Sequence, residues 1–266
     1  MSARARWPLY SVAAFTYALL YVPLFTLIIG AFNGSPQGGA WGGFSLRWFT
    51  ALFADQRVLG AAAFSLRVAA VNATLALVLG TLAAVALERI GGFRGRAALG
   101  GLVGLPLVVP EVITGLSLVL LFVALEQAVG WPARRGGDVI AIAHATLATA
   151  YTAVLLRDRL ARLDRSLEAA ARDLGAHPAA AFALVTVPAL APAMFAAWIL
   201  AFTLSLDDLM IASFVADADA LSLPMVVFAE SRSGLNPLVN ALATVMIVLV
   251  ASGLALSAWM RSRRAS

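Results

Sequence analysis

The sequence contains no cysteine and no lysine, and only two of its 266 residues are histidine. Without cysteine the chain has no disulfides, no thiolate metal ligands and no thiol nucleophile. The two histidines, His144 and His177, are too few for a metal centre built from histidine. The usual ATP-binding loop needs a lysine after a glycine-rich turn, so this chain does not supply one. We therefore expect no enzymatic activity, no metal and no cofactor bound by this chain.

Charge is scarce as well. Charged residues make up 12% of the chain and hydrophobic residues 62%, whereas soluble domains carry about 25% charged residues. All 19 basic residues are arginines, and most lie between apolar stretches without interleaved aromatic residues. That arrangement is typical of membrane topology signals rather than of a nucleic-acid-binding surface. The composition predicts an all-α, multi-pass protein of a bacterial inner (cytoplasmic) membrane, with no nucleic acid partner.

Six apolar stretches are long enough to cross a bilayer as helices, which takes roughly 20 residues each. They cover about 9–31, 61–87, 98–125, 138–156, 190–215 and 239–260. No small-residue cleavage site follows the first stretch, so we expect it to remain as a permanent helix. The sequence thus predicts a single transmembrane domain, residues 1–266, with six transmembrane helices.

The arginines are unequally divided between the two sides of such a domain. With the N-terminus in the cytoplasm, thirteen of the 19 arginines lie inside, Arg4 and Arg6 among them, and six lie outside. Because cytoplasmic loops carry an excess of positive charge, this count predicts that both termini are cytoplasmic.

This topology makes residues 157–189 the longest cytoplasmic loop. Its first part is rich in alanine, leucine, arginine and glutamate, which are good helix formers, and Gly175 ends the predicted helix. Pro178 then begins a short helix that Pro188 closes. We expect three apolar residues of this short helix to be exposed for a partner protein: Phe182, Leu184 and Val185. An ordinary solvated loop is the alternative.

The loop resembles the cytoplasmic signature of binding-protein-dependent ABC permeases: Glu-Ala-Ala, three residues and glycine, with Leu-Pro or Val-Pro about a dozen residues later. Ala169-Ala170-Ala171-Arg172-Asp173-Leu174-Gly175 and Val187-Pro188 have that spacing. The glutamate of the signature falls at Ala169, and Glu168 stands one residue earlier, about 100° away around a helix. Whether Glu168 replaces it stays open. The resemblance implies a type I ABC importer permease fold, in which this segment docks on an ATPase subunit through Glu168, Ala169, Ala170, Gly175, Phe182 and Pro188.

Three carboxylates fall at membrane depth within the apolar stretches: Glu111, Asp207 and Asp208. A charge at the bilayer centre costs about 2.5–3.5 kcal/mol, so these acids must face protein or a water-filled path. Two interpretations stay open. The acids either cap broken helices and pair with arginine, or line a passage for a cationic substrate. Asp207 and Asp208 point about 100° apart on a helix, so at most one of them faces such a path squarely.

The segments around these acids are similar to those of putrescine and spermidine permeases, notably Val109-Pro110-Glu111-Val112-Ile113-Thr114-Gly115 and Thr203-Leu204-Ser205-Leu206-Asp207-Asp208-Leu209. The resemblance implies a polyamine substrate, a second permease subunit that is a different chain, two ATPase subunits that bind ATP and Mg²⁺, and an extracytoplasmic substrate-binding protein. An ABC permease for another small cation and an ion-coupled secondary carrier are the alternatives. The sequence does not distinguish putrescine from spermidine.

Overall fold

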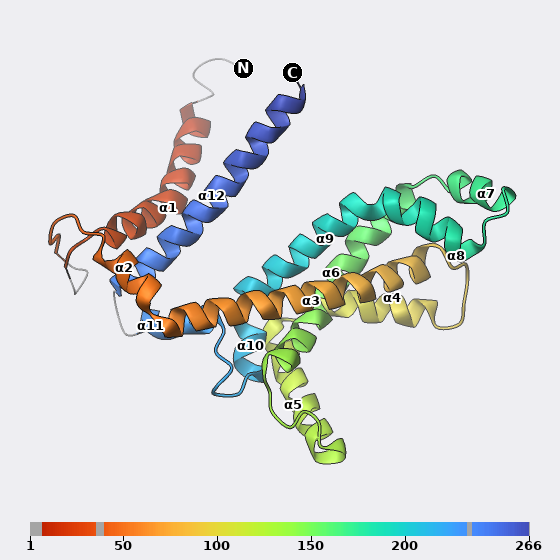
Figure 1. The fold of residues 1–266 in the computed structure, drawn as a ribbon, viewed down its shortest axis with the longest axis horizontal. Coiled ribbons are helices and arrows are strands. Elements are labelled where there is room, and N and C mark those ends of the chain that lie inside the picture. Colours follow the sequence, from red (N-terminus) through yellow and green to blue (C-terminus); the bar gives the residue numbers. More distant parts are fainter. Residues whose placement is uncertain (1–6, 36–39, 233–235, 266) are drawn as a thin grey trace. The chain divides into compact units, whose positions relative to one another are not determined.

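The computed structural model describes residues 7–35, 40–232 and 236–265, so Arg4 and Arg6 of the topology prediction lie outside the described residues. Apart from an isolated bridge between Asn33 and Phe44, the regular structure of the described residues is helical. Figure 1 shows the helices in chain order. They are α1 (Trp7–Ala31), α2 (Arg47–Ala54), α3 (Gln56–Glu88), α4 (Arg96–Gly104), the 3₁₀ turn η2 (Leu105–Leu107), α5 (Glu111–Val129), α6 (Gly137–Arg162), α7 (Ser166–Asp173), α8 (Pro178–Ala181), the π-helical η3 (Phe182–Thr186), α9 (Val187–Asp207), α10 (Met210–Val215), α11 (Leu223–Arg232) and α12 (Pro237–Ala265).

Five helical segments of the described residues are long and apolar enough to cross a membrane: Tyr10–Ala31, Gln56–Glu88, Glu111–Val129, Gly137–Arg162 and Pro178–Asp207. Two shorter apolar segments, Arg96–Leu107 and Pro237–Ser252, accompany them. Within an α-helix the backbone N–H and C=O groups hydrogen-bond to one another. Lipid offers them no partners, and this is why such apolar runs fold as helices. The predicted all-α membrane class is therefore confirmed.

The predicted third span, residues 98–125, is not a single helix. α4 ends at Gly104, the turn η2 follows, and α5 begins only at Glu111 after Pro110. Pro106 and Pro110 lack the backbone N–H that a continuing helix needs, so the chain breaks between them. The hydrophobic run continues through the break, which is why hydropathy alone joined the two helices.

The predicted fifth span, residues 190–215, is likewise divided. α9 ends at Asp207, Asp208 adopts an extended backbone conformation, and α10 begins at Met210. At its other end, the predicted break at Pro188 is absent, because the backbone stays helical from Pro178 to Asp207. The π-helical η3 lies directly before Pro188, where the hydrogen-bond register widens and a residue without an N–H is accommodated.

The chain forms two compact units, of which one joins the segment up to Gly60 with the segment from Val226 onward. In this unit α1 lies antiparallel along α12 (Figure 1). The indole Nε1 of Trp48, in α2, donates a 2.7 Å hydrogen bond to the carbonyl of Asn33. Arg57 pairs with Glu230, and this hydrogen bond holds the pKa of the Glu230 carboxyl below its usual range.

The other unit, Ala61–Met225, has α6 at its centre. α6 is the most buried of the five long helices, and it packs along α9. Small side chains on α3, α6 and α9 form a common buried cluster: Ala73, Ala76, Ala148 and Ala201. Small residues let helix backbones approach closely, which is how helices associate where water supplies no driving force. These contacts fix the positions of the polar residues described below.

Gly80 is the tightest of these contacts. A Cβ added there would lie 2.6 Å from Thr152 Cγ2 and 3.0 Å from the backbone nitrogen of Ala153, both on α6. Gly115, on α5, faces Phe214 of α10 in the same way, with 2.8 Å to Cδ2. In contrast, a Cβ at Gly101 of α4 would meet no heavy atom within 4 Å.

We predict that Gly80→Ala lowers the free energy of unfolding by about 1–3 kcal/mol, because overpacking forces α3 and α6 apart. Gly101→Ala is the matched control and should be neutral or stabilising by up to about 1 kcal/mol, since alanine is the better helix former. Thermal unfolding of the protein in detergent micelles measures both. Equal midpoints for the two variants would contradict the close packing of α3 on α6.

Candidate functional site

The segment between α6 and α9, residues 163–186, consists of two helical parts joined at a glycine, and we call this segment the frame. Asp164 accepts a 2.9 Å hydrogen bond from the N–H of Ser166 at the start of α7, and this bond holds the pKa of the Asp164 carboxyl below its usual range. At the other end of α7, Gly175 has a φ of +91°, which favours glycine. The Gly175 and Ala176 amides donate to the carbonyls of Arg172 and Ala171, the pattern of a glycine helix stop. The predicted end of this helix is confirmed.

The second helix of the frame begins at Pro178. The ring nitrogen Nδ1 of His177 accepts a hydrogen bond from the N–H of Ala179, so His177 caps this helix. From here α8, η3 and α9 form one continuous helical path. A helix predicted to be short and separate is therefore the rigid extension of a long apolar helix, and its displacement would be transmitted directly along α9.

The apolar residues that are exposed on this frame differ in part from those that the sequence predicts. Leu184 is 76% exposed, whereas Phe182 and Val185 are only partly exposed. Leu174, next to Gly175, is 90% exposed and was missed by the sequence reasoning, which treated it only as part of a helix end. Of the other predicted docking residues, Ala169, Ala170, Gly175 and Pro188 are exposed.

Glu168 points into the unit rather than out of it. Its carboxylate accepts a hydrogen bond from the hydroxyl of Thr186 in η3, and it lies 3.7 Å from Nη2 of Arg89 at the end of α3. The side chain of Arg89 is only 11% exposed. Glu168, one residue before the position expected for the signature glutamate, thus binds residues of its own chain.

The two adjacent aspartates at the α9–α10 break have different surroundings, as their 100° separation predicts. Asp207 is exposed, whereas the side chain of Asp208 is 8% exposed. Oδ1 of Asp208 accepts a 3.0 Å hydrogen bond from the N–H of Ala212 and so caps α10. This contact agrees with the first of the two interpretations left open by the sequence, in which an acid caps a broken helix.

His144 completes the surroundings of Asp208. Its Nε2 lies 3.2 Å from Oδ1 of Asp208, an electrostatic contact whose geometry does not make it a hydrogen bond. Its Nδ1 forms a 2.7 Å hydrogen bond with the hydroxyl of Ser205 in α9. A cavity of about 10 Å³ beside these residues has room for about one water molecule. The space is far too small for an organic solute.

Glu111 is the first residue of α5 and is exposed. α5 packs on α10 through Gly115, which faces Phe214 and Ile211. Further along α5, Phe122 belongs to the same buried cluster as Ile211 and Val215. α5 and α10 therefore run side by side, each beginning after a break, with a carboxylate at or near its first turn. A carboxylate at the start of a helix is stabilised by the positive end of the helix dipole.

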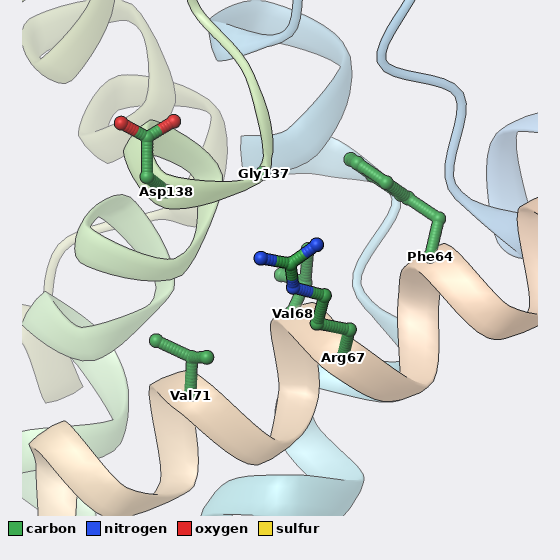
Figure 2. A pocket seen from close by; sticks show the side chains of 6 residues that line it. All are labelled: Phe64, Arg67, Val68, Val71, Gly137 and Asp138. Atoms are coloured by element: carbon green, nitrogen blue, oxygen red, sulfur yellow. The ribbon is translucent and has the colours of Figure 1, made fainter.

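Figure 2 shows a separate cavity of about 320 Å³ between α3 and the start of α6. The guanidinium of Arg67 reaches from α3 toward Gly137, while the carboxylate of Asp138 points away from it (Figure 2). Phe64, Val68 and Val71 supply the apolar wall. None of the three predicted path acids lines this cavity, whose charged lining residues are Arg67 and Asp138.

Comparisons with known proteins agree with this arrangement. The profile of a family described as "Binding-protein-dependent transport system inner membrane component" matches residues 76–265. The chain is 51% identical over 231 residues to the "Putrescine transport system permease protein PotI" of Escherichia coli K12, covering 87% of this chain and 82% of that protein. It is 36% identical to the "Spermidine/putrescine transport system permease protein PotC" of Haemophilus influenzae, covering 88% of each.

The fold is also found among solved structures. A bacterial alginate ABC transporter, in complex with an alginate pentasaccharide-bound periplasmic protein, matches with a TM-score of 0.72 at 14% identity, covering 98% of this chain and 96% of that one. At this identity the likeness establishes the fold alone.

The cluster around Asp208 generates a stability prediction. His144→Phe keeps the ring but removes both nitrogens, which leaves Asp208 buried without its neighbour. We expect a loss of about 1–3 kcal/mol in the free energy of unfolding, because the buried Ser205 hydroxyl loses its hydrogen-bond partner and the Asp208 carboxylate loses its polar neighbour. Asp207→Asn, one residue from Asp208 but exposed, should change it by less than about 0.5 kcal/mol. Thermal melting in detergent compares the two, and a similar loss in both variants would refute the structural role of the cluster.

Proposed function

This chain belongs to the binding-protein-dependent transport system inner membrane components, and on that premise we propose that it forms the translocation path of an ATP-driven importer for a polyamine such as putrescine or spermidine. The frame between α6 and α9 is the observation that carries the proposal, because it presents two exposed leucines to a partner: Leu184 on the helical extension of α9, and Leu174 at the end of α7. The printed names of the two relatives support the substrate class.

We propose six spans with both termini in the cytoplasm. α1, α3, α6 and α12 each supply one span, α4 with α5 supplies the broken third span, and α9 with α10 supplies the broken fifth. This assignment puts the frame between α6 and α9 on the cytoplasmic side, in agreement with the excess of arginine there. ATP is available on that side, which is where an ATPase subunit must dock.

The partners follow from this topology. We propose that a second permease chain, two ATPase subunits and an extracytoplasmic substrate-binding protein complete the importer, and that ATP and Mg²⁺ bind to the ATPase subunits. The absence of lysine from this chain supports a separate ATPase. A periplasmic protein is part of the alginate transporter complex named above, which supports the corresponding partner here.

For the substrate path, Glu111 and Asp207 are the acids that we assign. Both are exposed in the isolated subunit and lie at the start of α5 and at the end of α9, beside the two helix breaks. A polyamine carries several ammonium groups, and a carboxylate with no other charged partner attracts them. Asp208 is excluded from this role because His144 and the start of α10 already occupy it.

In the proposed mechanism, the ATPase subunits move the frame between α6 and α9 when they close on ATP. Because α8, η3 and α9 are continuous, this movement reaches the α9–α10 break, where Asp207 lies. The path then opens to the outside and to the cytoplasm in turn. A polyamine exchanges one weak carboxylate contact for the next, since an importer must also release its cargo.

The substrate path is tested by uptake of labelled putrescine and spermidine into vesicles that contain the whole complex. We predict that Asp207→Asn and Glu111→Gln each reduce the uptake rate by about 5- to 30-fold, the effect of about 1–2 kcal/mol on a charge contact. Glu126→Gln, an exposed acid at the far end of α5, is the control and should leave uptake unchanged. Normal uptake in both path variants would refute the assignment of these acids.

The coupling role is tested separately by ATP hydrolysis. We predict that Leu184→Ala and Leu174→Ala abolish most of the stimulation of hydrolysis by loaded binding protein, because exposed apolar anchors dominate docking energies. Leu20→Ala, on the exposed helix α1, is a matched control of the same size change. Uptake that needs no ATP and follows a proton gradient would instead establish an ion-coupled carrier.

A further inference from the structure

Arginine side chains from three other segments hold the end of α3. Nη2 of Arg96 donates a 2.7 Å hydrogen bond to the carbonyl of Leu87, and Nη2 of Arg165 donates a 2.8 Å bond to the carbonyl of Glu88. The carboxylate of Glu88 pairs with Nε of Arg157 at 3.4 Å. The last carbonyls of a helix have no partner within the helix, and these arginines supply one. The end of α3 is thus fixed to the segments that surround the frame.

Arg89, the residue that follows α3, makes a contact in the other direction, because its side chain extends from the end of α3 to a residue of the frame. Its guanidinium is largely buried, and Nε and Nη1 have no hydrogen-bond partner among the described residues. The only carboxylate that the structure places within 4 Å of it in the described residues is that of Glu168, on α7. The same carboxylate binds Thr186 of η3, which is itself buried. One acid therefore joins three segments: the end of α3, α7 and η3.

We propose that Arg89 and Glu168 are positioning residues that tie the frame between α6 and α9 to α3, so that a displacement of the frame moves α3 together with α9. This inference rests on the proposed function, in which an ATPase subunit displaces the frame. The frame has a covalent connection to α9 and α6 but none to α3, and its other contact with α3 is made by the exposed side chain of Arg165. With the tie, one docking event drives two long helices.

Burial and charge make the tie specific. A buried guanidinium needs a compensating negative charge, and here Glu168 supplies it. Removal of that charge leaves Arg89 uncompensated, so the frame must shift to let the cation reach water. The nearby pair of Asp158 with Arg162 is different, because both side chains are more than 60% exposed and water screens the contact. It provides a matched control with the same types of group.

The first experiment measures the uptake of labelled putrescine per ATP hydrolysed by the whole complex in vesicles. We expect Glu168→Gln and Arg89→Gln to lower this ratio by at least about fivefold, while the ATPase subunits still co-purify and still hydrolyse ATP. The exchanged pair Arg89→Glu with Glu168→Arg should recover part of the ratio, and Asp158→Asn should not change it. Thr186→Val, which removes only one hydroxyl, is the milder variant if the others do not assemble.

The second experiment follows the tie itself and does not depend on the substrate. Because the chain has no cysteine, cysteines introduced at Ile90 and Asp173, both exposed, can carry spin labels in the assembled complex. We expect one narrow distribution of distances between these labels that is the same with and without ATP. Glu168→Gln, introduced into the labelled chain, should broaden or shift this distribution when ATP binds.

The outcomes separate this inference from the proposed function. An unchanged distance distribution in Glu168→Gln, or an unchanged ratio of uptake to hydrolysis, overturns the tie. A complex that imports another cation refutes the polyamine assignment, yet a distribution that broadens in Glu168→Gln supports the tie all the same. If Leu184→Ala does not affect hydrolysis, docking at this surface is refuted, whereas the spin labels still report whether α3 follows α7.

Discussion

The need to satisfy every backbone polar group inside a membrane is the constraint on which the rest of this structure depends. Lipid offers no hydrogen bonds, so an interrupted helix must find partners for its free ends within the protein. At the α9–α10 break these partners are Asp208, which caps α10, and His144, which lies against the Asp208 carboxylate. Asp208, a charged residue within an apolar run, is therefore required for the helix break.

Close packing of small residues makes such a cluster possible. Gly80 and the alanines shared by α3, α6 and α9 bring these helices near enough to exclude lipid from His144 and Ser205. Within the same unit, much of α5 stays exposed. The carboxylate of Asp208 is thus buried beside His144, whereas Glu111 and Asp207 are exposed.

The sequence predicted the helical membrane class, the glycine stop at Gly175 and the different orientations of Asp207 and Asp208, because each depends on composition or local geometry. It did not predict which aspartate is buried, since that depends on His144, 61 residues before Ser205. The breaks at Pro110 and Asp208 were hidden within apolar runs. Pro188 was expected to end a helix, but the backbone stays helical through the π-helical η3 and Pro188.

A shift of one residue along α7 determines whether a glutamate faces outward or binds its own chain. At Ala169, the position expected for the glutamate, the side chain is exposed toward a partner, whereas at Glu168 it is turned about 100° and meets Arg89 and Thr186. In the proposed importer, the exposed leucines Leu174 and Leu184 supply the docking contacts, and Glu168 does not. The acid is free to do something else, which is to make the docking frame and α3 move as one body. Recognition and transmission are in this way assigned to different residues of the same short segment.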